Sequence, residues 1–353
     1  MDPKAQTMMQ AVIFKAPGNL SLEQVPEPLA GAGEVLLRVG LAGVCATDLH
    51  IYRGHFRVAG PRILGHEVAG VVEAVGPGVD SGWLGKTCGV RPAQFCGECE
   101  ACRNGREEYC LNFQCLGNTR DGGYAGKCLV KAEQLVDLPG LELESLVWLE
   151  PLACVMRALE LAQVREGECM LVTGAGVLGQ LFVKALRASG SSRVAVVDPN
   201  PEKIELARRN GAEQGWVVAR SGRTARADRL IRAWSGNGPQ VVIETSGKPE
   251  ALRRATRWAG LAGRIILFGV PEPEAQLNLK LADIFHKGLR VLPCNGMTVK
   301  SFQAGADLLA SRRLDLSGQP AVHIDLPEVA ETFREAKLFG KGKIFIHPAG
   351  GTA

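Results

Sequence analysis

The sequence predicts an α/β protein in which a β-rich segment is followed by a doubly wound parallel sheet. Residues 10–92 hold short Val- and Leu-rich runs separated by Gly and Pro turns, a pattern typical of strands. From about residue 155 to 292, apolar strand candidates alternate with helical patterns, which is typical of parallel strands joined by helices. Residues 169–198 join a strand, a glycine-rich turn, a helix and a second strand in one unit, and the rest of the chain is organised around it.

Length and composition narrow the possible classes. The chain has 353 residues, which favours two domains, and its 46% hydrophobic and 22% charged residues are typical of a globular protein. A net charge of +4 is too small to indicate nucleic-acid or membrane-surface partners. No apolar run reaches the ~18 residues of a membrane span, and the N-terminus lacks a signal-peptide core. We therefore expect a cytoplasmic protein whose 11 cysteines are better explained as metal ligands than as disulfides.

The predicted strands and tail give a domain organisation. Residues 155–294 form the predicted cofactor domain, and residues 10–154 form the domain before it. The tail, residues 295–353, is too short for a domain of its own, so we expect it to complete the first one. It contains a helix candidate and a last strand candidate, Ser301–Leu309 and Lys343–His347. The strands expected in the cofactor domain are Met170–Thr173, Val194–Val197, Val241–Glu244, Arg264–Phe268 and Leu289–Leu292.

The glycine-rich turn at residues 174–179 predicts a dinucleotide-binding site. It reads G-x-G-x-x-G, follows a strand candidate and precedes a helix whose apolar residues lie on one face. The first glycine permits the tight turn, the second lets the backbone approach a pyrophosphate, and the third lets the helix pack against the strand. The phosphates would sit on the N–H groups at the helix N-terminus. The residues predicted to bind the cofactor here are Gly174, Gly176, Val177, Leu178 and Gly179.

Asp198 predicts which dinucleotide is bound. It closes the second strand, 19 residues after Gly179. Its carboxylate would accept hydrogen bonds from a ribose 2′-hydroxyl and repel a 2′-phosphate. No arginine follows it directly, since the next residues are Pro199, Asn200 and Pro201. NAD is therefore favoured over NADP.

A cysteine-dense lobe at residues 96–110 predicts a structural zinc site. Four thiolates at this spacing can close a tetrahedral shell around one Zn²⁺ and leave no open position. A disulfide pair or free thiols is the alternative. A closed site does no chemistry, and its role would be to hold a loop that has little apolar material. The predicted ligands are Cys96, Cys99, Cys102 and Cys110.

A second set of donors is dispersed along the first domain. One thiolate, one imidazole and one carboxylate would suit Zn²⁺ and leave a fourth position open for substrate or water. Taken singly, each residue also has an ordinary structural explanation, such as a core cysteine, a packed histidine or a surface acid. The candidates are Cys45, His66, Glu67 and Glu150.

At these residues the chain resembles a zinc-dependent medium-chain alcohol dehydrogenase, of the sorbitol, butanediol and threonine dehydrogenase branch. The resemblance covers about residues 10–347 and includes, in family order, GVCATDLH, ILGHEVAGVVEAVG, the four-cysteine lobe, LEPLACV and TGAGVLG. It implies a GroES-like catalytic domain completed by the tail, a Rossmann cofactor domain, NAD, one catalytic and one structural zinc, and a homodimer or homotetramer. The implied reaction is hydride transfer between a secondary alcohol or polyol and NAD, which gives a ketone.

The resemblance also implies roles for individual residues. Cys45 and His66 match zinc ligands, and the remaining protein ligand is Glu67 or Glu150, with exchange between them open. Thr47 would take the proton of the alcohol, and His50 would pass it to solvent. Two further roles are implied: Asp48 would orient His66, and Lys343 matches a position where relatives use a basic residue near the pyrophosphate.

Departures from the branch leave the substrate open. Sorbitol dehydrogenases have Tyr where this chain has Ile51, and Arg-Tyr where it has Leu292-Pro293. The loss of polar groups makes the pocket less suited to a long polyol, because its hydroxyls would lack partners. A small secondary alcohol, a diol or a shorter polyol is an alternative substrate, and threonine dehydrogenase is the closest rival. Two other classes are a zinc-less reductase or non-catalytic relative, disfavoured because Cys45 and His66 are present, and a zinc-finger-like interaction protein, which leaves TGAGVLG unexplained.

Overall fold

The computed structural model describes residues 7–191, 193–220 and 224–348 of the chain. These residues divide into two compact units. Of the described residues, unit 1 comprises those up to Pro151 together with residues 298–310 and 317–348, and unit 2 comprises those from Leu152 to Met297 and from Ser311 to Leu316. Most of the tail is therefore part of the same unit as the N-terminal segment. No helix of the described residues is both long enough and apolar enough to cross a membrane.

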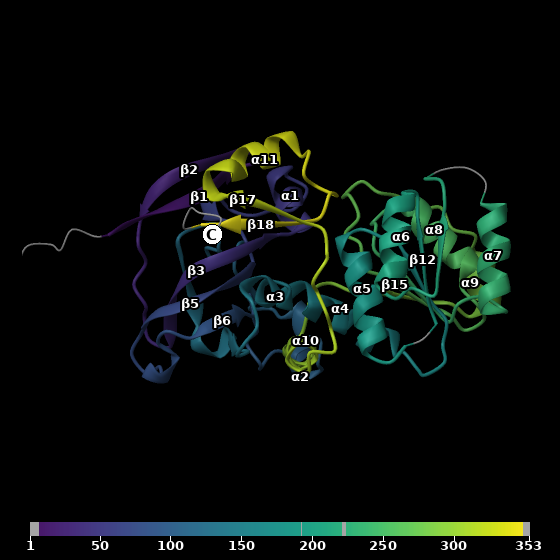
Figure 1. Cartoon of the computed structure of the whole chain (residues 1–353), viewed down its shortest axis with the longest axis horizontal. Helices are drawn as coiled ribbons and strands as arrows, with labels where there is room; N and C mark the ends of the chain where they lie inside the picture. Colours follow the sequence, from purple (N-terminus) through teal and green to yellow (C-terminus); the bar gives the residue numbers. More distant parts are fainter. Residues whose placement is uncertain (1–6, 192, 221–223, 349–353) are drawn as a thin grey trace, which may run out of the picture. The chain divides into compact units, whose positions relative to one another are not determined.

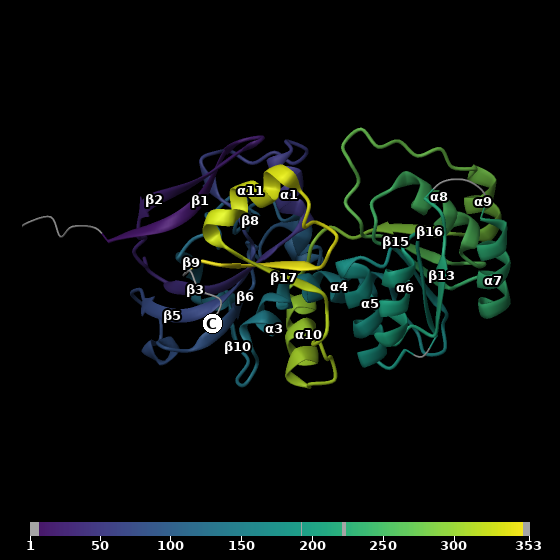
Figure 2. The ribbon, with the colours of Figure 1, turned by 45° about the horizontal axis from the view of Figure 1, so that its top comes forward.

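Unit 1 is built on a mixed sheet with the strand order β10-β6-β5-β3-β18-β17, and β9 also pairs with β3 (Figures 1 and 2). Strand β18 comes from the tail, pairs antiparallel with β3, and thereby joins the two ends of the sequence in one sheet. Most residues of β3 are buried, as expected of a strand in the interior of the sheet that is covered on both faces. The strands are β3 (Glu34–Val44), β5 (Glu67–Val75), β6 (Thr87–Val90), β9 (Lys127–Lys131), β10 (Leu135–Asp137), β17 (Ala321–Asp325) and β18 (Lys343–His347).

Smaller elements complete unit 1. A second sheet has the order β2-β1-β4, and β7 pairs with β8 beside the cysteine lobe. The strands are β1 (Met8–Ala16), β2 (Asn19–Pro26), β4 (Arg62–Ile63), β7 (Ala93–Gln94) and β8 (Gln114–Cys115). The helices are α1 (Ala46–Tyr52), α2 (Glu100–Arg103), α3 (Leu143–Val147), α10 (Val299–Ala310) and α11 (Val329–Glu335). Helix α4 (Leu149–Ala162) begins in unit 1 and continues into unit 2.

Unit 2 is a parallel sheet with the strand order β13-β12-β11-β14-β15-β16, the order of a Rossmann fold. Helices α5 and α6 lie on one side of this sheet and α7, α8 and α9 on the other (Figure 2). The strands are β11 (Met170–Thr173), β12 (Val194–Asp198), β13 (Gln214–Val217), β14 (Val241–Glu244), β15 (Arg264–Leu267) and β16 (Arg290–Pro293). The helices are α5 (Val177–Ala188), α6 (Pro201–Arg209), α7 (Ala225–Ser235), α8 (Pro249–Trp258) and α9 (Leu281–Lys287).

The predicted α/β class with a doubly wound sheet is confirmed. Strands β11 and β14 are buried at every position, because helices cover both faces, and this is why they read as continuous apolar runs. The sequence pattern did not predict β13 or β17. Strand β13 lies at the edge of its sheet and reads Gln-Gly-Trp-Val, which has neither an apolar run nor a clean alternation. Strand β17 is likewise at an edge and largely exposed.

Candidate metal and dinucleotide sites

Three of the dispersed donors meet in unit 1. One ligand atom each from Cys45, His66 and Glu67 lie within 4.8 Å of one another. The sheet register explains this convergence, because Gly43 near the end of β3 pairs with Glu67 at the start of antiparallel β5. Cys45 follows the end of β3 directly, and His66 directly precedes β5. The pairing of these neighbouring antiparallel strands therefore brings the three donors together where β3 ends and β5 begins. The set of thiolate, imidazole and carboxylate fits Zn²⁺.

Helix α1 fixes Cys45 and the two polar residues after it. Cys45 is the N-cap, and its sulfur accepts a hydrogen bond from the backbone N–H of Thr47 at 3.5 Å. The hydroxyl of Thr47 also lies 3.5 Å from this sulfur, so a proton-accepting group stands beside the donor set. Asp48 completes the cap by accepting the backbone N–H of Cys45 at 2.9 Å. His50 lies one turn further along α1, with its ring 5.6 Å from the ring of His55.

Asp48 connects the donor set to a buried tyrosine. Its Oδ1 faces Nδ1 of His66 at 3.6 Å, and its Oδ2 accepts a hydrogen bond from the hydroxyl of Tyr124 at 2.7 Å. Burial favours a neutral His66, but the negative charges of Asp48 and Cys45 outweigh burial and hold the pKa of His66 well above its ordinary value. An environment that favours a cation at His66 also suits a metal ion bound beside it. Tyr124 was not predicted from the sequence; its one signal was a lone aromatic residue among the glycines of residues 122–126.

Lys343 has an ion-pair partner that the sequence did not predict. Its ammonium forms an ion pair with Glu67 inside unit 1 and donates a hydrogen bond to the carbonyl of Val44 at 3.2 Å. Lys343 is only 4% exposed and Glu67 only 1%. The family resemblance implied a basic residue near the pyrophosphate at this position. The structure gives the ammonium a carboxylate partner that belongs to the donor set, and nothing in the local sequence around Lys343 signals that pairing.

Glu150 is not part of the three-residue donor set. It lies in the first turn of α4 and is 9% exposed. It is nevertheless close enough to affect Cys115, together with His66, Asp48 and Cys45. Burial, reinforced by the negative charges of Glu150, Asp48 and Cys45 and opposed by His66, raises the pKa of Cys115 to about 12, so its thiol stays protonated near neutral pH. Cys115 is thus a further thiol near the donor set, and the sequence spacing gave no indication of it.

The four cysteines of the lobe converge as a second donor set. The sulfurs of Cys96, Cys99, Cys102 and Cys110 lie within 4.8 Å of one another, and all four are free thiols. Backbone N–H groups also point at these sulfurs, including that of Cys96 toward Cys110 at 3.3 Å and that of Cys99 toward Cys96 at 3.4 Å. Hydrogen bonds from the N–H groups of Cys102 and Leu111 lower the pKa of Cys99 to about 6. The donor set and its backbone support fit a closed zinc site.

The glycine-rich turn in unit 2 has the geometry of a phosphate-binding loop. Gly174 has a φ of +97°, a conformation that only glycine adopts without strain, and a Cβ on Gly179 would overlap the carbonyl oxygen of Gly174. Gly176 is the N-cap of α5, and a Cβ there would meet no atom within 4 Å. The second glycine therefore leaves open space in front of the helix N-terminus, where Val177 and Leu178 begin α5.

Asp198 and Thr245 are among the side chains that hold this turn, and Thr245 was unexpected. Asp198 at the end of β12 accepts the backbone N–H of Ala175 at 2.7 Å and that of Asn200 at 2.8 Å. Thr245, which follows β14, donates its hydroxyl to the carbonyls of Thr173 and Gly174 at 2.9 and 3.1 Å. The sequence predicted Asp198 but not Thr245, because Thr245 reaches the turn only through the pairing of β11 with β14.

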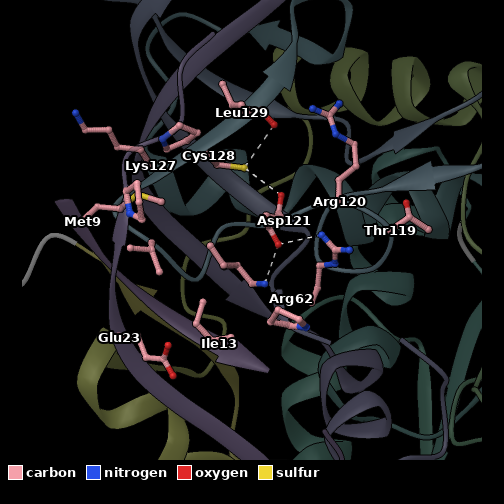
Figure 3. Close-up of a pocket in the computed structure, with 16 residues that line it drawn as sticks. Met9, Ile13, Glu23, Arg62, Thr119, Arg120, Asp121, Lys127, Cys128 and Leu129 are labelled. Atoms are coloured by element: carbon pink, nitrogen blue, oxygen red, sulfur yellow. Dashed lines mark hydrogen bonds and ion pairs between the residues drawn. The ribbon is translucent and has the colours of Figure 1, made fainter. Parts of the chain in front are cut away.

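A cavity of about 590 Å³ in unit 1 lies apart from both donor sets (Figure 3). None of the metal-donor residues lines it. Its charged groups are already paired, with Arg62 3.0 Å from Asp121 and Lys127 2.8 Å from Glu27. Cavity size and donor chemistry therefore point to different places. Ligand atoms that could hold a metal converge at the two donor sets and not at this cavity, where Nε of Arg62 is buried without a hydrogen-bond partner.

Comparison with known proteins identifies the family of this chain. Residues 31–140 match the family described as "Alcohol dehydrogenase GroES-like domain", and residues 177–311 match "Zinc-binding dehydrogenase". A 2-dehydro-3-deoxy-L-galactonate 5-dehydrogenase from Pseudoalteromonas atlantica is 33% identical over 289 residues, 81% of this chain and 82% of that protein. An L-threonine 3-dehydrogenase from Pyrococcus horikoshii is 33% identical over 87% of this chain and 89% of its own length. A zinc-binding dehydrogenase from Sinorhizobium meliloti 1021, crystallised with NADP, has a TM-score of 0.89 at 29% identity, covering 97% of this chain and 100% of that one.

Proposed function

We propose that this chain, which belongs to the zinc-binding dehydrogenase family, oxidises a secondary alcohol or polyol to a ketone with NAD as the hydride acceptor. The chain is a zinc- and nicotinamide-dependent oxidoreductase with a GroES-like domain and a Rossmann domain. The observation that carries the proposal is the convergence of Cys45, His66 and Glu67 beside the hydroxyl of Thr47.

Cys45 and His66 would hold the catalytic zinc, with Glu67 or Glu150 as the further protein ligand. Zinc at this position would act as a Lewis acid that makes an alcohol easier to deprotonate. Thr47 would accept the alcohol proton through its hydroxyl, and His50 would pass that proton toward solvent. The proximity of Glu67 to Cys45 and His66 favours Glu67 over Glu150 in the resting site. Cys96, Cys99, Cys102 and Cys110 would bind the structural zinc.

The cofactor would bind at the turn of residues 174–179. The open space in front of Gly176 supports a pyrophosphate there, and the carboxylate of Asp198 supports NAD over NADP by charge. In this assignment residues 10–154 and 295–353 make up the catalytic domain, and residues 155–294 the cofactor domain. Lys343 is the weakest of the proposed cofactor contacts, because its ammonium is paired with Glu67.

The substrate is a small molecule with a secondary alcohol. A diol such as 2,3-butanediol, or L-threonine oxidised at its 3-hydroxyl, is the alternative to a polyol, and the identity to an L-threonine 3-dehydrogenase supports testing it directly. We further propose a cytoplasmic homodimer or homotetramer with neither nucleic-acid nor membrane partners.

The test is NADH formation across a panel of secondary alcohols, diols, polyols and L-threonine, with NADP⁺ and a chelator-treated sample in parallel. We expect turnover with NAD⁺ that is lost on chelation and restored by zinc. Activity that survives complete zinc removal would contradict the mechanism, and a clear preference for NADP⁺ would contradict the role given to Asp198. Activity on L-threonine but not on polyols or diols would select the alternative.

A further inference from the structure

The ion pair between Glu67 and Lys343 is enclosed by unit 1. The two side chains are 2% and 4% exposed. The ammonium of Lys343 also lies 5.5 Å from the centre of the Trp148 ring, over its face, and donates a hydrogen bond to the carbonyl of Val44. The lysine therefore has three partners inside the protein.

Gly43 makes this pair possible. It lies in β3, between Glu67 on β5 and Phe345 on β18, in the order β5-β3-β18. A Cβ on Gly43 would overlap Oε2 of Glu67 and would lie 3.0 Å from Cε of Lys343. The missing side chain at residue 43 thus leaves a passage through which the lysine reaches across the central strand to the carboxylate.

Glu67 consequently has two partners that compete for it. It is a member of the metal-donor set with Cys45 and His66, and its Oε2 is held by Lys343. A carboxylate that pairs with an ammonium donates less negative charge to a neighbouring metal, and the ammonium itself repels a divalent cation nearby. Both effects weaken metal binding. Both also keep the bound metal more electron-poor, and a more electron-poor metal is a stronger Lewis acid.

We propose that Lys343 is a positioning residue that holds Oε2 of Glu67 away from the catalytic zinc, so that the zinc binds less tightly and polarises the alcohol more strongly. This proposal rests on the proposed function of the Cys45–His66–Glu67 site. It assigns to Lys343 a role at the metal in place of a role at the cofactor phosphates. It also explains why a lysine is buried at this point of β18, where an apolar residue would pack without cost.

The test measures two dissociation constants on full-length Lys343→Met. Zinc affinity is measured by competition with a chromogenic chelator, in protein whose lobe site stays filled, and NADH affinity is measured by fluorescence titration. We expect zinc to bind about tenfold tighter, since changes in groups that support a metal ligand alter affinity by about 10- to 100-fold. We also expect kcat to fall, a changed absorption spectrum with Co²⁺ in the site, and an unchanged NADH affinity.

An unchanged zinc affinity in Lys343→Met would overturn the proposal. If Lys343 binds the pyrophosphate, Lys343→Met weakens NADH binding and leaves zinc affinity as in the wild type. If Lys343 is only structural, the substitution lowers stability without tightening zinc. Lys343→Arg keeps the charge and should leave zinc affinity close to that of the wild type. The matched control is Lys341→Met, because Lys341 is exposed two residues earlier in the chain and should change neither constant.

Two further variants keep the test decisive. Lys343→Met leaves a buried carboxylate without its cation and could impair folding, whereas Glu67→Gln/Lys343→Met has no buried charge at either position. Zinc should bind more tightly to this double variant than to Glu67→Gln, which retains the buried ammonium, and equal affinities would refute the electrostatic argument. If zinc binds more tightly to the variant but the protein turns over no alcohol, the role of Lys343 is supported and the proposed reaction is rejected. Failure of the Lys343 proposal can therefore be told apart from failure of the proposed function.

Discussion

The hydroxyl of Tyr124 donates a 2.7 Å hydrogen bond to Oδ2 of Asp48, and both residues are completely buried. The same tyrosine ring occupies the space in which a Cβ on Gly65 would lie, directly before His66. Gly65 has a φ of +93°, so the chain turns there only because the residue is glycine. Tyr124 thus supports His66 in two ways, through Asp48 and through the backbone of Gly65.

Tyr124→Phe removes the hydrogen bond to Asp48 and keeps the ring against Gly65. We expect zinc affinity at the Cys45 site to fall about tenfold, as is usual when a partner of a metal-ligating histidine is lost, with a similar fall in kcat/KM. Chelator competition and steady-state kinetics measure the two effects. Tyr52→Phe is the control, because Tyr52 also packs on the ring of Phe333. An unchanged zinc affinity in Tyr124→Phe would show that Asp48 orients His66 without help from the tyrosine.

Gly176→Ala should impair cofactor binding without destabilising the protein. A Cβ at Gly176 meets no protein atom within 4 Å, so only a bound pyrophosphate would clash with it. We expect NADH affinity to fall about tenfold or more and the melting temperature to stay unchanged. Gly179→Ala is the contrasting variant, because its Cβ would overlap the carbonyl of Gly174 and should lower both affinity and stability. Normal NADH binding by a folded Gly176→Ala protein would exclude the turn as the phosphate site.

The two donor sets should lose zinc with different consequences. Cys45→Ser should remove one zinc per chain, as measured by atomic emission, and lower kcat/KM on the order of a thousandfold, since a zinc Lewis acid is worth several kcal/mol. Cys99→Ser should remove the other zinc and lower the melting temperature more than Cys45→Ser does, because the lobe has little apolar core to replace the metal. Two zinc ions retained in either variant would contradict the assignment of that site.

The Asp228 carboxylate makes unit 2 more stable at neutral than at acidic pH. Burial raises the pKa of Asp228, but hydrogen bonds from Trp258 and Thr224 and the Arg257 guanidinium outweigh burial and lower it. The Trp258 and Arg257 contacts are both 2.7 Å. Because the folded-state pKa lies below the unfolded value of ~3.9, this stabilisation is complete above that value and is lost as the pH falls through the folded pKa.

Asp228→Asn tests this pH dependence. We expect the variant to lose about 1.5–3 kcal/mol of stability at pH 7, the usual value of a hydrogen bond to a charged group. The difference in melting temperature from the wild type should shrink as the pH is lowered below ~4. If the melting temperatures of the variant and the wild type differ by the same amount at pH 7 and at the lowest pH that the protein tolerates, the shape of the Asp228 side chain, and not its charge, accounts for its effect.

The sequence predicted those strands and helices whose apolar pattern lies within one continuous stretch of the chain. Strand β11 has the same bounds in the structure as in the prediction, because a parallel strand buried on both faces must be apolar throughout. The helix predicted at Ser301–Leu309 begins two residues earlier and ends one residue later. Strand β13 was missed because an edge strand needs apolar side chains on one face at most, and Gly215 and Trp216 do not form such a pattern.

The sequence by itself determined the four-cysteine lobe and the glycine-rich turn, because the residues of each site lie within about fifteen positions and meet through local chain geometry. Only the tertiary structure decided how the dispersed donors combine. The antiparallel register of β3 and β5 brings Cys45 to Glu67, whereas Glu150 lies outside the donor set. Lys343 reaches Glu67 from 276 residues away because β18 pairs with β3 across a glycine. Contacts of this kind depend on which strands pair and in which register, and side-chain spacing along the chain does not encode that choice.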